Sequence, residues 1–224
     1  MTQSHDIRPL TLFADKTVYV VGLGASGMAA AEGLRAGGAH VLCWDDNQAT
    51  RDKAAAQGFD IDDPATSSRL EEAAALVLAP GIPLTNPTPH PAALAARAAG
   101  VEILGDIELL FRAQPEARFV GITGTNGKST TTALVGHILR QGGVEVAIGG
   151  NLGIPALTLP NAAVYVLEMS SYQLDLTPSA MFDIAVLLNI TPDHLDRHGD
   201  MDGYIRAKMR ILRPRNADSL AVVG

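Results

Sequence analysis

A glycine-rich loop with the letters GITGTNGKST, at residues 121–130, is the feature that most constrains the fold of this chain. The residues before it predict a strand, and those after it predict a helix that runs to about Arg140. Glycines allow backbone N–H groups to turn inward around phosphate oxygens, and the following helix adds its positive end. The loop is not a strict Walker A sequence, because Ile122 stands where that motif has its first glycine. Its place between strand and helix predicts a phosphate-binding loop rather than an accidental turn.

The side chains of this loop suit a nucleoside triphosphate. Lys128 supplies a positive charge for the β- and γ-phosphates, and the Ser129 hydroxyl can bind Mg²⁺. The residues predicted to bind the nucleotide are Gly124, Thr125, Asn126, Gly127, Lys128, Ser129 and Thr130.

A second glycine loop, with the letters GLGASG, occupies residues 22–27. A strand at 16–21 precedes it, and a helix at 28–36 and a strand at 41–44 follow, which is a Rossmann-type unit. Asp45 lies 23 residues after Gly22, a spacing that suits a ribose-binding carboxylate. This loop alone would also fit a dehydrogenase. Two nucleotide loops in series favour an enzyme that joins a nucleotide-bearing substrate to ATP chemistry.

The remaining pattern predicts an α/β fold: a Rossmann-like N-terminal domain followed by a partial P-loop ATP-binding domain, each with a mainly parallel sheet. We expect the boundaries at residues 1–105, a linker at 106–117 with a short helix at 107–111, and an incomplete ATP-binding domain at 118–224. Other predicted strands are 76–79, 101–104, 145–148, 163–168, 183–188 and one that begins at 220, and other predicted helical segments are 54–58, 68–75 and 201–212.

Composition excludes several classes of protein. A net charge of −7 argues against a nucleic-acid binder, which usually has a basic face. The single cysteine, Cys43, cannot form an internal disulfide, and its apolar neighbours predict a buried strand position rather than a catalytic thiol. The N-terminus has no apolar signal core, and no apolar run approaches the roughly 18 residues that cross a membrane. We therefore expect a soluble, cytoplasmic protein without membrane insertion.

Four further side chains could carry chemistry. Glu168 ends a predicted strand, where a carboxylate can meet a metal above the phosphate loop, although such a residue is more often a surface or capping group. His194 and His198 have the spacing of a helical metal pair, but the glutamate of the zinc-peptidase pattern is missing, and a solvated turn is the alternative. Lys208 would by default face solvent from its helix.

Taken together, these segments resemble the Mur ligase family. Residues 119–132 resemble its ATP loop, 149–155 its substrate-contact loop, and 167–174 and 188–197 its metal and substrate segments. Within the family, the runs at 79–82, 105–109 and 170–174 point to members that add D-glutamate. The resemblance covers nearly the whole chain from Lys16.

The resemblance implies a reaction in which ATP, UDP-N-acetylmuramoyl-L-alanine and D-glutamate give ADP, phosphate and an amide through an acyl phosphate. It implies ATP and Mg²⁺ as cofactors, with Ser129 and Glu168 on one Mg²⁺ and His194 with a carbamylated Lys208 on a second. Lys128, His194 and Lys208 become the catalytic residues. The substrate-binding positions that it implies are Ala25, Ser26, Asp46, Asn47 and Asn151, with a basic residue in place of Asn47 in some family members.

The resemblance also implies a C-terminal domain that binds D-glutamate and that these 224 residues do not include. We therefore expect a truncated chain that binds the UDP substrate but does not perform ligation by itself. Other interpretations are a sister ligase of the Mur or folylpolyglutamate type, an NAD(P)-binding Rossmann module with a vestigial second loop, and a non-catalytic binding protein.

Overall fold

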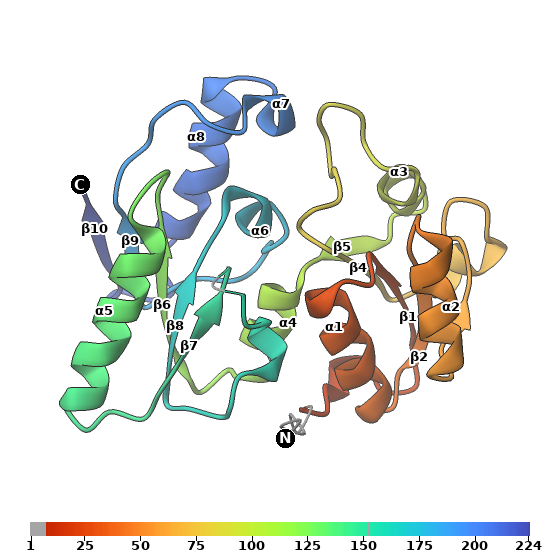
Figure 1. Cartoon of the computed structure of the whole chain (residues 1–224), viewed down its shortest axis with the longest axis horizontal. Helices are drawn as coiled ribbons and strands as arrows, with labels where there is room; N and C mark the ends of the chain where they lie inside the picture. The colour runs from red at the N-terminus through yellow and green to blue at the C-terminus, as the bar shows by residue number, and fades with distance from the viewer. Residues whose placement is uncertain (1–7, 152) are drawn as a thin grey trace.

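Two parallel sheets of five strands each form the framework of the computed structural model, which describes residues 8–151 and 153–224 (Figure 1). The first has the order β3-β2-β1-β4-β5, with β1 at Thr17–Val21, β2 at His40–Trp44, β3 at Asp60–Ile61, β4 at Ala75–Leu78 and β5 at Glu102–Leu104. The second has the order β10-β9-β6-β8-β7, with β6 at Arg118–Thr123, β7 at Val146–Gly150, β8 at Val164–Glu168, β9 at Ile184–Leu187 and β10 at Leu220–Val223. Every strand pairing is parallel, which confirms the predicted fold class.

Helices cover the sheets, so the middle residues of the inner strands β1, β4, β6 and β8 are buried and mostly apolar rather than alternating with polar ones. The first half of the molecule, from η1 to β5, carries η1 at Thr11–Phe13, α1 at Ala25–Ala36, α2 at Gln48–Ala56, η2 at Ser68–Glu72 and α3 at Pro91–Ala98. The second half, from α4 to β10, carries α4 at Asp106–Ala113, α5 at Lys128–Gln141, η3 at Ala156–Thr158, α6 at Ser171–Asp175, α7 at Leu195–His198, α8 at Met201–Met209 and η4 at Arg210–Leu212.

Close packing of α1 on the first sheet depends on a glycine. A Cβ atom at Gly27 would lie 1.9 Å from the backbone oxygen of Gly22, so any larger residue would push the helix off the loop. Gly22 itself has a φ of 87°, which disfavours side chains. The first glycine loop therefore has the tight strand-to-helix turn that a Rossmann unit needs.

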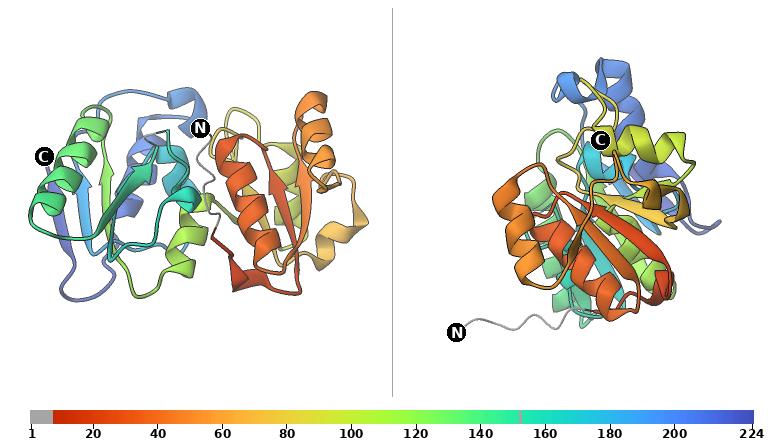
Figure 2. Two further views of the ribbon diagram at one scale, coloured as in Figure 1. Left: turned by 60° about the horizontal axis from the view of Figure 1, so that its bottom comes forward. Right: turned by 90° about the vertical axis from the view of Figure 1, so that its right-hand side faces the viewer.

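Helix α4, within the segment expected to be a linker, packs between the two halves (Figure 2). It contacts α1 and η1 on one side and η3 on the other. Ile107, Leu109 and Leu110 are buried in one apolar cluster that also contains Leu34 of the first half and Tyr165 of the second. This continuous core fixes the orientation of the two halves.

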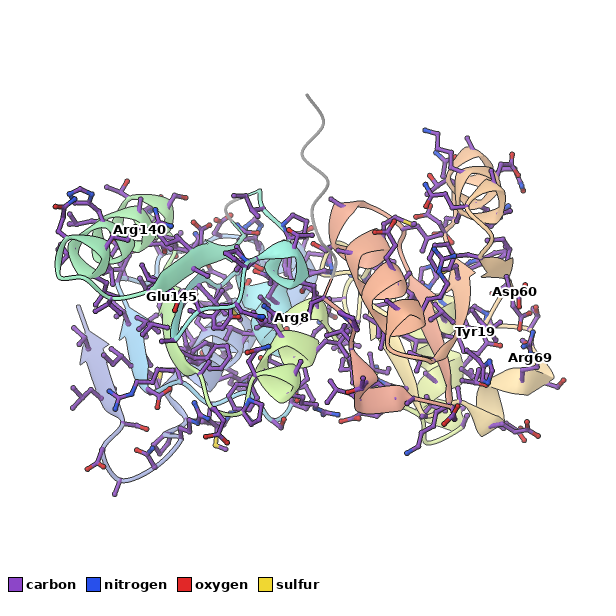
Figure 3. All side chains as sticks on the ribbon, turned by 90° about the horizontal axis from the view of Figure 1, so that it is seen from below. Arg8, Tyr19, Asp60, Arg69, Arg140 and Glu145 are labelled. Carbon is purple, nitrogen blue, oxygen red and sulfur yellow. The ribbon has the colours of Figure 1, made fainter. Side chains whose placement is uncertain are left out.

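Polar contacts add to this connection. Arg8, labelled in Figure 3, donates hydrogen bonds to the backbone oxygen of Leu159 at 3.1 Å and to the Tyr165 hydroxyl at 2.9 Å. The Arg197 guanidinium donates to the backbone oxygen of Gly81 at 2.9 Å. Both links join the N-terminal part of the chain to its second half.

Several element predictions differ in extent from the structure. The helix expected at 54–58 is the end of α2, and the segment expected to be helical at 68–75 is the short η2 followed by the start of β4. The helix expected at 201–212 divides into α8 and η4. Cys43 is fully buried, and burial raises the pKa of its thiol to about 12, as suits an inert core residue. Among the described helices, none has the length and apolar character that crossing a bilayer requires.

Candidate active site

The predicted phosphate-binding loop leaves the carboxyl end of β6 and enters α5 at Lys128. Gly127 precedes the helix with a φ of 81°, in the left-handed region that glycine tolerates best. The 14-residue helix that follows directs its N-terminal backbone N–H groups at this point, where Asn126, Ser129 and Thr130 are exposed. The loop therefore offers an anion site at the edge of the second sheet.

Asn189, which follows β9, holds this loop in place. Its side-chain oxygen accepts the backbone N–H of Asn126 at 2.9 Å, and its amide donates to the backbone oxygen of Asn126 at 3.2 Å. The Thr125 hydroxyl lies 3.1 Å from that of Tyr204 and accepts the backbone N–H of Thr191 at 3.0 Å. The sequence analysis missed Asn189 as a site residue. Its position just after a parallel strand that pairs with β6 was the available signal.

Lys128 lies across the loop. Its ammonium group donates to the backbone oxygens of Gly124 at 3.0 Å and Thr125 at 2.9 Å. The positive charge of Lys128 thus already lies beside the loop, where it would attract a bound phosphate group.

Glu168, the last residue of β8, is buried with 2% exposure. One carboxylate oxygen accepts a hydrogen bond from the Asn151 side chain at 2.9 Å, while the other, Oε2, is buried and has no hydrogen-bond partner among the described residues. A buried carboxylate oxygen without a partner is costly, so it marks a place where a cation or donor group would be stabilised. The predicted site residues Glu168 and Asn151 are therefore in direct contact.

Lys208 does not face solvent, so the default expectation for a helix lysine is wrong here. The side chain is 1% exposed and donates to the backbone oxygen of Gly124 at 2.8 Å. Burial, reinforced by the charge of Lys128, lowers the pKa of Lys208 to about 8. Helix α8 therefore brings a second amine to the same loop as Lys128.

This lowered pKa predicts a pH-dependent stability. In metal-free, CO₂-free buffer, the free energy of unfolding of the wild-type chain should rise relative to that of Lys208→Met by about 1–3 kcal/mol between pH 8 and 10.5. The unfolded chain keeps the lysine proton up to its ordinary pKa of 10.5, whereas the folded chain has released it. Urea denaturation at several pH values measures the difference, and a flat difference would mean that Lys208 titrates normally.

The two histidines that have the spacing of a helical metal pair, His194 and His198, have different environments. His194 has a φ of 51° at the start of α7, is half exposed, and its ring lies 5.1 Å from that of Tyr172. His198 is buried, with its Nε2 atom 2.9 Å from the Ser171 hydroxyl and its Nδ1 atom 3.6 Å from the Asp175 carboxylate. Burial, with nearby positive charges, lowers the pKa of His198. Of the two side chains, His194 is thus the accessible one, at 48% exposure against 4% for His198.

In the first half, Asp45 holds the glycine loop. Its two carboxylate oxygens accept the backbone N–H groups of Leu23 at 2.8 Å and Asn47 at 2.9 Å. Asn47 in turn caps α2, and Asp46 is exposed and pairs with His90 at 3.1 Å. The ribose-binding role expected for Asp45 would compete with these backbone contacts.

A cleft with a volume of about 300 Å³ connects the two halves. The first half contributes Ala25 and Ser26, at the start of α1, together with Pro80, and the second half contributes Asn151 and Gln173. The predicted substrate residues Ala25, Ser26 and Asn151 are therefore brought together, whereas Asp46 and Asn47 do not line this cleft.

Gln173 is a further cleft residue that the sequence analysis missed. Its backbone N–H donates to the Ser170 hydroxyl at 3.2 Å, and its side-chain oxygen accepts the backbone N–H of Ser170 at 3.0 Å. This reciprocal capping box starts α6, and the S-x-x-Q spacing in the sequence was the signal for it.

Comparison with known proteins gives two family matches. Residues 122–224 match the Mur ligase middle domain, and residues 12–81 match the NADPH-binding domain of acetohydroxy acid isomeroreductase. The chain is 52% identical over 225 residues to a UDP-N-acetylmuramoylalanine–D-glutamate ligase of Caulobacter vibrioides (strain NA1000 / CB15N), which covers 96% of this chain and 48% of that protein. It is 53% identical, with the same coverage, to the ligase of that name from Phenylobacterium zucineum (strain HLK1). The chain thus spans about half the length of these curated relatives.

Solved structures agree on the fold. The UDP-N-acetylmuramate:L-alanyl-gamma-D-glutamyl-meso-diaminopimelate ligase of Neisseria meningitides matches with a TM-score of 0.58 and 18% identity, over 94% of this chain and 72% of that one. A murein peptide ligase from Psychrobacter arcticus 273-4 matches with a TM-score of 0.54 and 18% identity, over 93% of this chain and 48% of that one. At this identity the likeness concerns the fold alone.

Proposed function

We propose that this chain, which belongs to the Mur ligase family, carries the UDP-substrate and ATP sites of a ligase that adds D-glutamate to UDP-N-acetylmuramoyl-L-alanine in peptidoglycan synthesis. One observation carries the proposal: the cleft that begins at the glycine loop of the first half ends at Asn151, which contacts Glu168. A nucleotide-linked substrate held by the first loop would therefore extend toward the second.

The proposed reaction has two steps. A carboxylate oxygen of UDP-N-acetylmuramoyl-L-alanine attacks the γ-phosphorus of ATP, and the bond from that phosphorus to ADP breaks. The amine of D-glutamate then attacks the acyl carbon, loses a proton and displaces phosphate. Both substrates of the first step are anions, so a main task of the site is to hold repelling charges in line. Lys128 and the N-terminus of α5 supply fixed positive charge for this purpose.

The donor set suits Mg²⁺, a cation that prefers oxygen ligands. The buried, unpartnered Oε2 atom of Glu168 is the observation that fits best, and the exposed Ser129 hydroxyl would join it. When bound, Mg²⁺ offsets phosphate charge. We assign His194 and Lys208 to a second cation. The lowered pKa of Lys208 supports this assignment, because only a neutral amine combines with CO₂ to form an anionic carbamate.

The competing function is an NADPH-binding module, which the match of residues 12–81 favours. The contacts of Asp45 count against it, because both carboxylate oxygens already hold backbone N–H groups. The phosphate loop and the buried Glu168 would also have no role in such a module.

Calorimetric titration of the purified chain tests the proposal. We expect saturable binding of UDP-N-acetylmuramoyl-L-alanine and none of NADPH. Ser26→Trp, which would fill the first wall of the cleft, should abolish that binding. Ser68→Trp at the exposed start of η2 is the matched control and should leave it unchanged. Binding of NADPH alone, or no binding of the UDP compound, would overturn the proposal.

A further inference from the structure

A second cleft, with a volume of about 350 Å³, opens between α8 and the segment that leads into α3. Figure 1 shows these two elements facing each other across the upper part of the molecule. The first half contributes Thr85, Asn86 and Arg97, and the second contributes Asp175, Arg206 and Arg210. This cleft has no part in the function proposed above.

The walls of this cleft are basic because of helix geometry. Gly203, Arg206, Ala207 and Arg210 follow each other at i, i+3, i+4 and i+7, so they share one face, and that face lines the cleft. The acidic residue of the same helix, Asp202, does not line it. On the opposite wall, Arg97 is the one charged residue of α3. Three arginines thus line one cleft in a chain whose net charge is −7.

The local acidic group compensates only one of these charges. Asp175 pairs with Arg210 at 3.3 Å. Within residues 8–151 and 153–224, Arg97 and Arg206 make no ion pair and no side-chain hydrogen bond. Two uncompensated cations on facing walls repel one another, and an anion between them would turn that repulsion into attraction.

We propose that this cleft binds a small polyvalent oxyanion, one that carries phosphate or carboxylate groups, and that this anion bridges Arg97 of the first half and Arg206 of the second. Guanidinium forks match the geometry of both oxyanion types. The volume limits the ligand to a small molecule, since one water occupies roughly 30 Å³ of liquid. Thr85 and Asn86 add polar groups on the first wall.

The test is calorimetric titration with pyrophosphate and, separately, with citrate. Every variant in this test also carries Lys128→Ala, so that anion binding at the loop of residues 124–130 adds less to the measured signal. Removal of the two facing charges by Arg97→Gln with Arg206→Gln should weaken binding at least tenfold. The matched control, Arg69→Gln with Arg118→Gln, removes two exposed arginines elsewhere and should change it less than twofold. Thermal unfolding of each variant confirms that it is folded.

The two titrations also identify the ligand class. Tighter binding of pyrophosphate assigns the cleft to phosphate esters, and tighter binding of citrate assigns it to carboxylates. Equal losses in the cleft variant and the control variant would overturn the proposal, because the effect would then be one of overall charge. Binding of neither anion below about 1 mM would also overturn it.

Discussion

Lys128→Ala is expected to weaken ATP binding by this chain about 10- to 100-fold, because a charge-assisted hydrogen bond to phosphate contributes roughly 1.5–3 kcal/mol. The lysine already lies beside the loop, with its ammonium group on the backbone oxygens of Gly124 and Thr125, so little reorganisation precedes binding. Removal of the side chain leaves the N–H groups of the helix N-terminus as the remaining source of positive charge. Calorimetry with ATP and Mg²⁺ measures the change.

The matched control for this variant is Lys53→Ala. Lys53 is exposed on α2, in the first half of the molecule, and its removal changes the net charge by the same amount. Its ATP affinity should stay within twofold of the wild type. If Lys128→Ala bound ATP as tightly as Lys53→Ala, the loop at 124–130 would not be the nucleotide site.

Elements defined by local pattern were predictable from the sequence. The continuous apolar strands and the two glycine loops predicted both parallel sheets, because strands covered on both faces need no polar alternation. Elements that depend on only a few residues were missed, among them β3 with two residues, α6 with five and α7 with four. Such short segments have too little periodicity to be distinguished from loops, although the capping box at Ser170 was a readable signal for α6.

The arrangement of the candidate site was predictable where a motif lies within a few residues, as in the loop between β6 and α5. It was not predictable where distant segments meet. Lys208 lies 84 positions from Gly124, and only the packing of α8 against the loop shows that its amine is buried there. Asn189 is similar, because its role depends on β9 lying next to β6. The propensities of the residues predict whether a segment is a helix or a strand. Which side chains from other segments lie next to it depends on the tertiary structure.

Helix α4 gives the clearest difference between pattern and packing. The sequence predicted a short helix in a linker, and the helix is present, but nothing in its pattern predicts that Glu108 is completely buried. Its carboxylate accepts hydrogen bonds from the Arg112 guanidinium at 2.7 Å and from the backbone N–H groups of Ser179 at 3.1 Å and Ala180 at 3.0 Å. The Ser179 hydroxyl donates a further bond. One side chain thus connects α4 to the segment that leads into β9.

Glu108→Ala is expected to lower the free energy of unfolding by about 3–5 kcal/mol, because it leaves a guanidinium and two backbone N–H groups without their buried acceptor. Such a loss is a large fraction of the total stability of a domain of this size. Urea denaturation followed by circular dichroism measures it. Glu108→Gln should be less harmful, since the amide keeps one acceptor oxygen for these donors.

Glu102→Ala is the control that separates burial from charge. Glu102 pairs with the same guanidinium, at 2.5 and 3.0 Å, and Arg112 lowers the pKa of Glu102, but the carboxylate is 41% exposed. An exposed pair contributes at most about 1 kcal/mol, so this variant should unfold nearly as the wild type does. Similar losses in Glu102→Ala and Glu108→Ala would mean that pairing with Arg112 stabilises the chain. The larger loss at Glu108 would instead assign the stability to the buried N–H groups that its carboxylate holds.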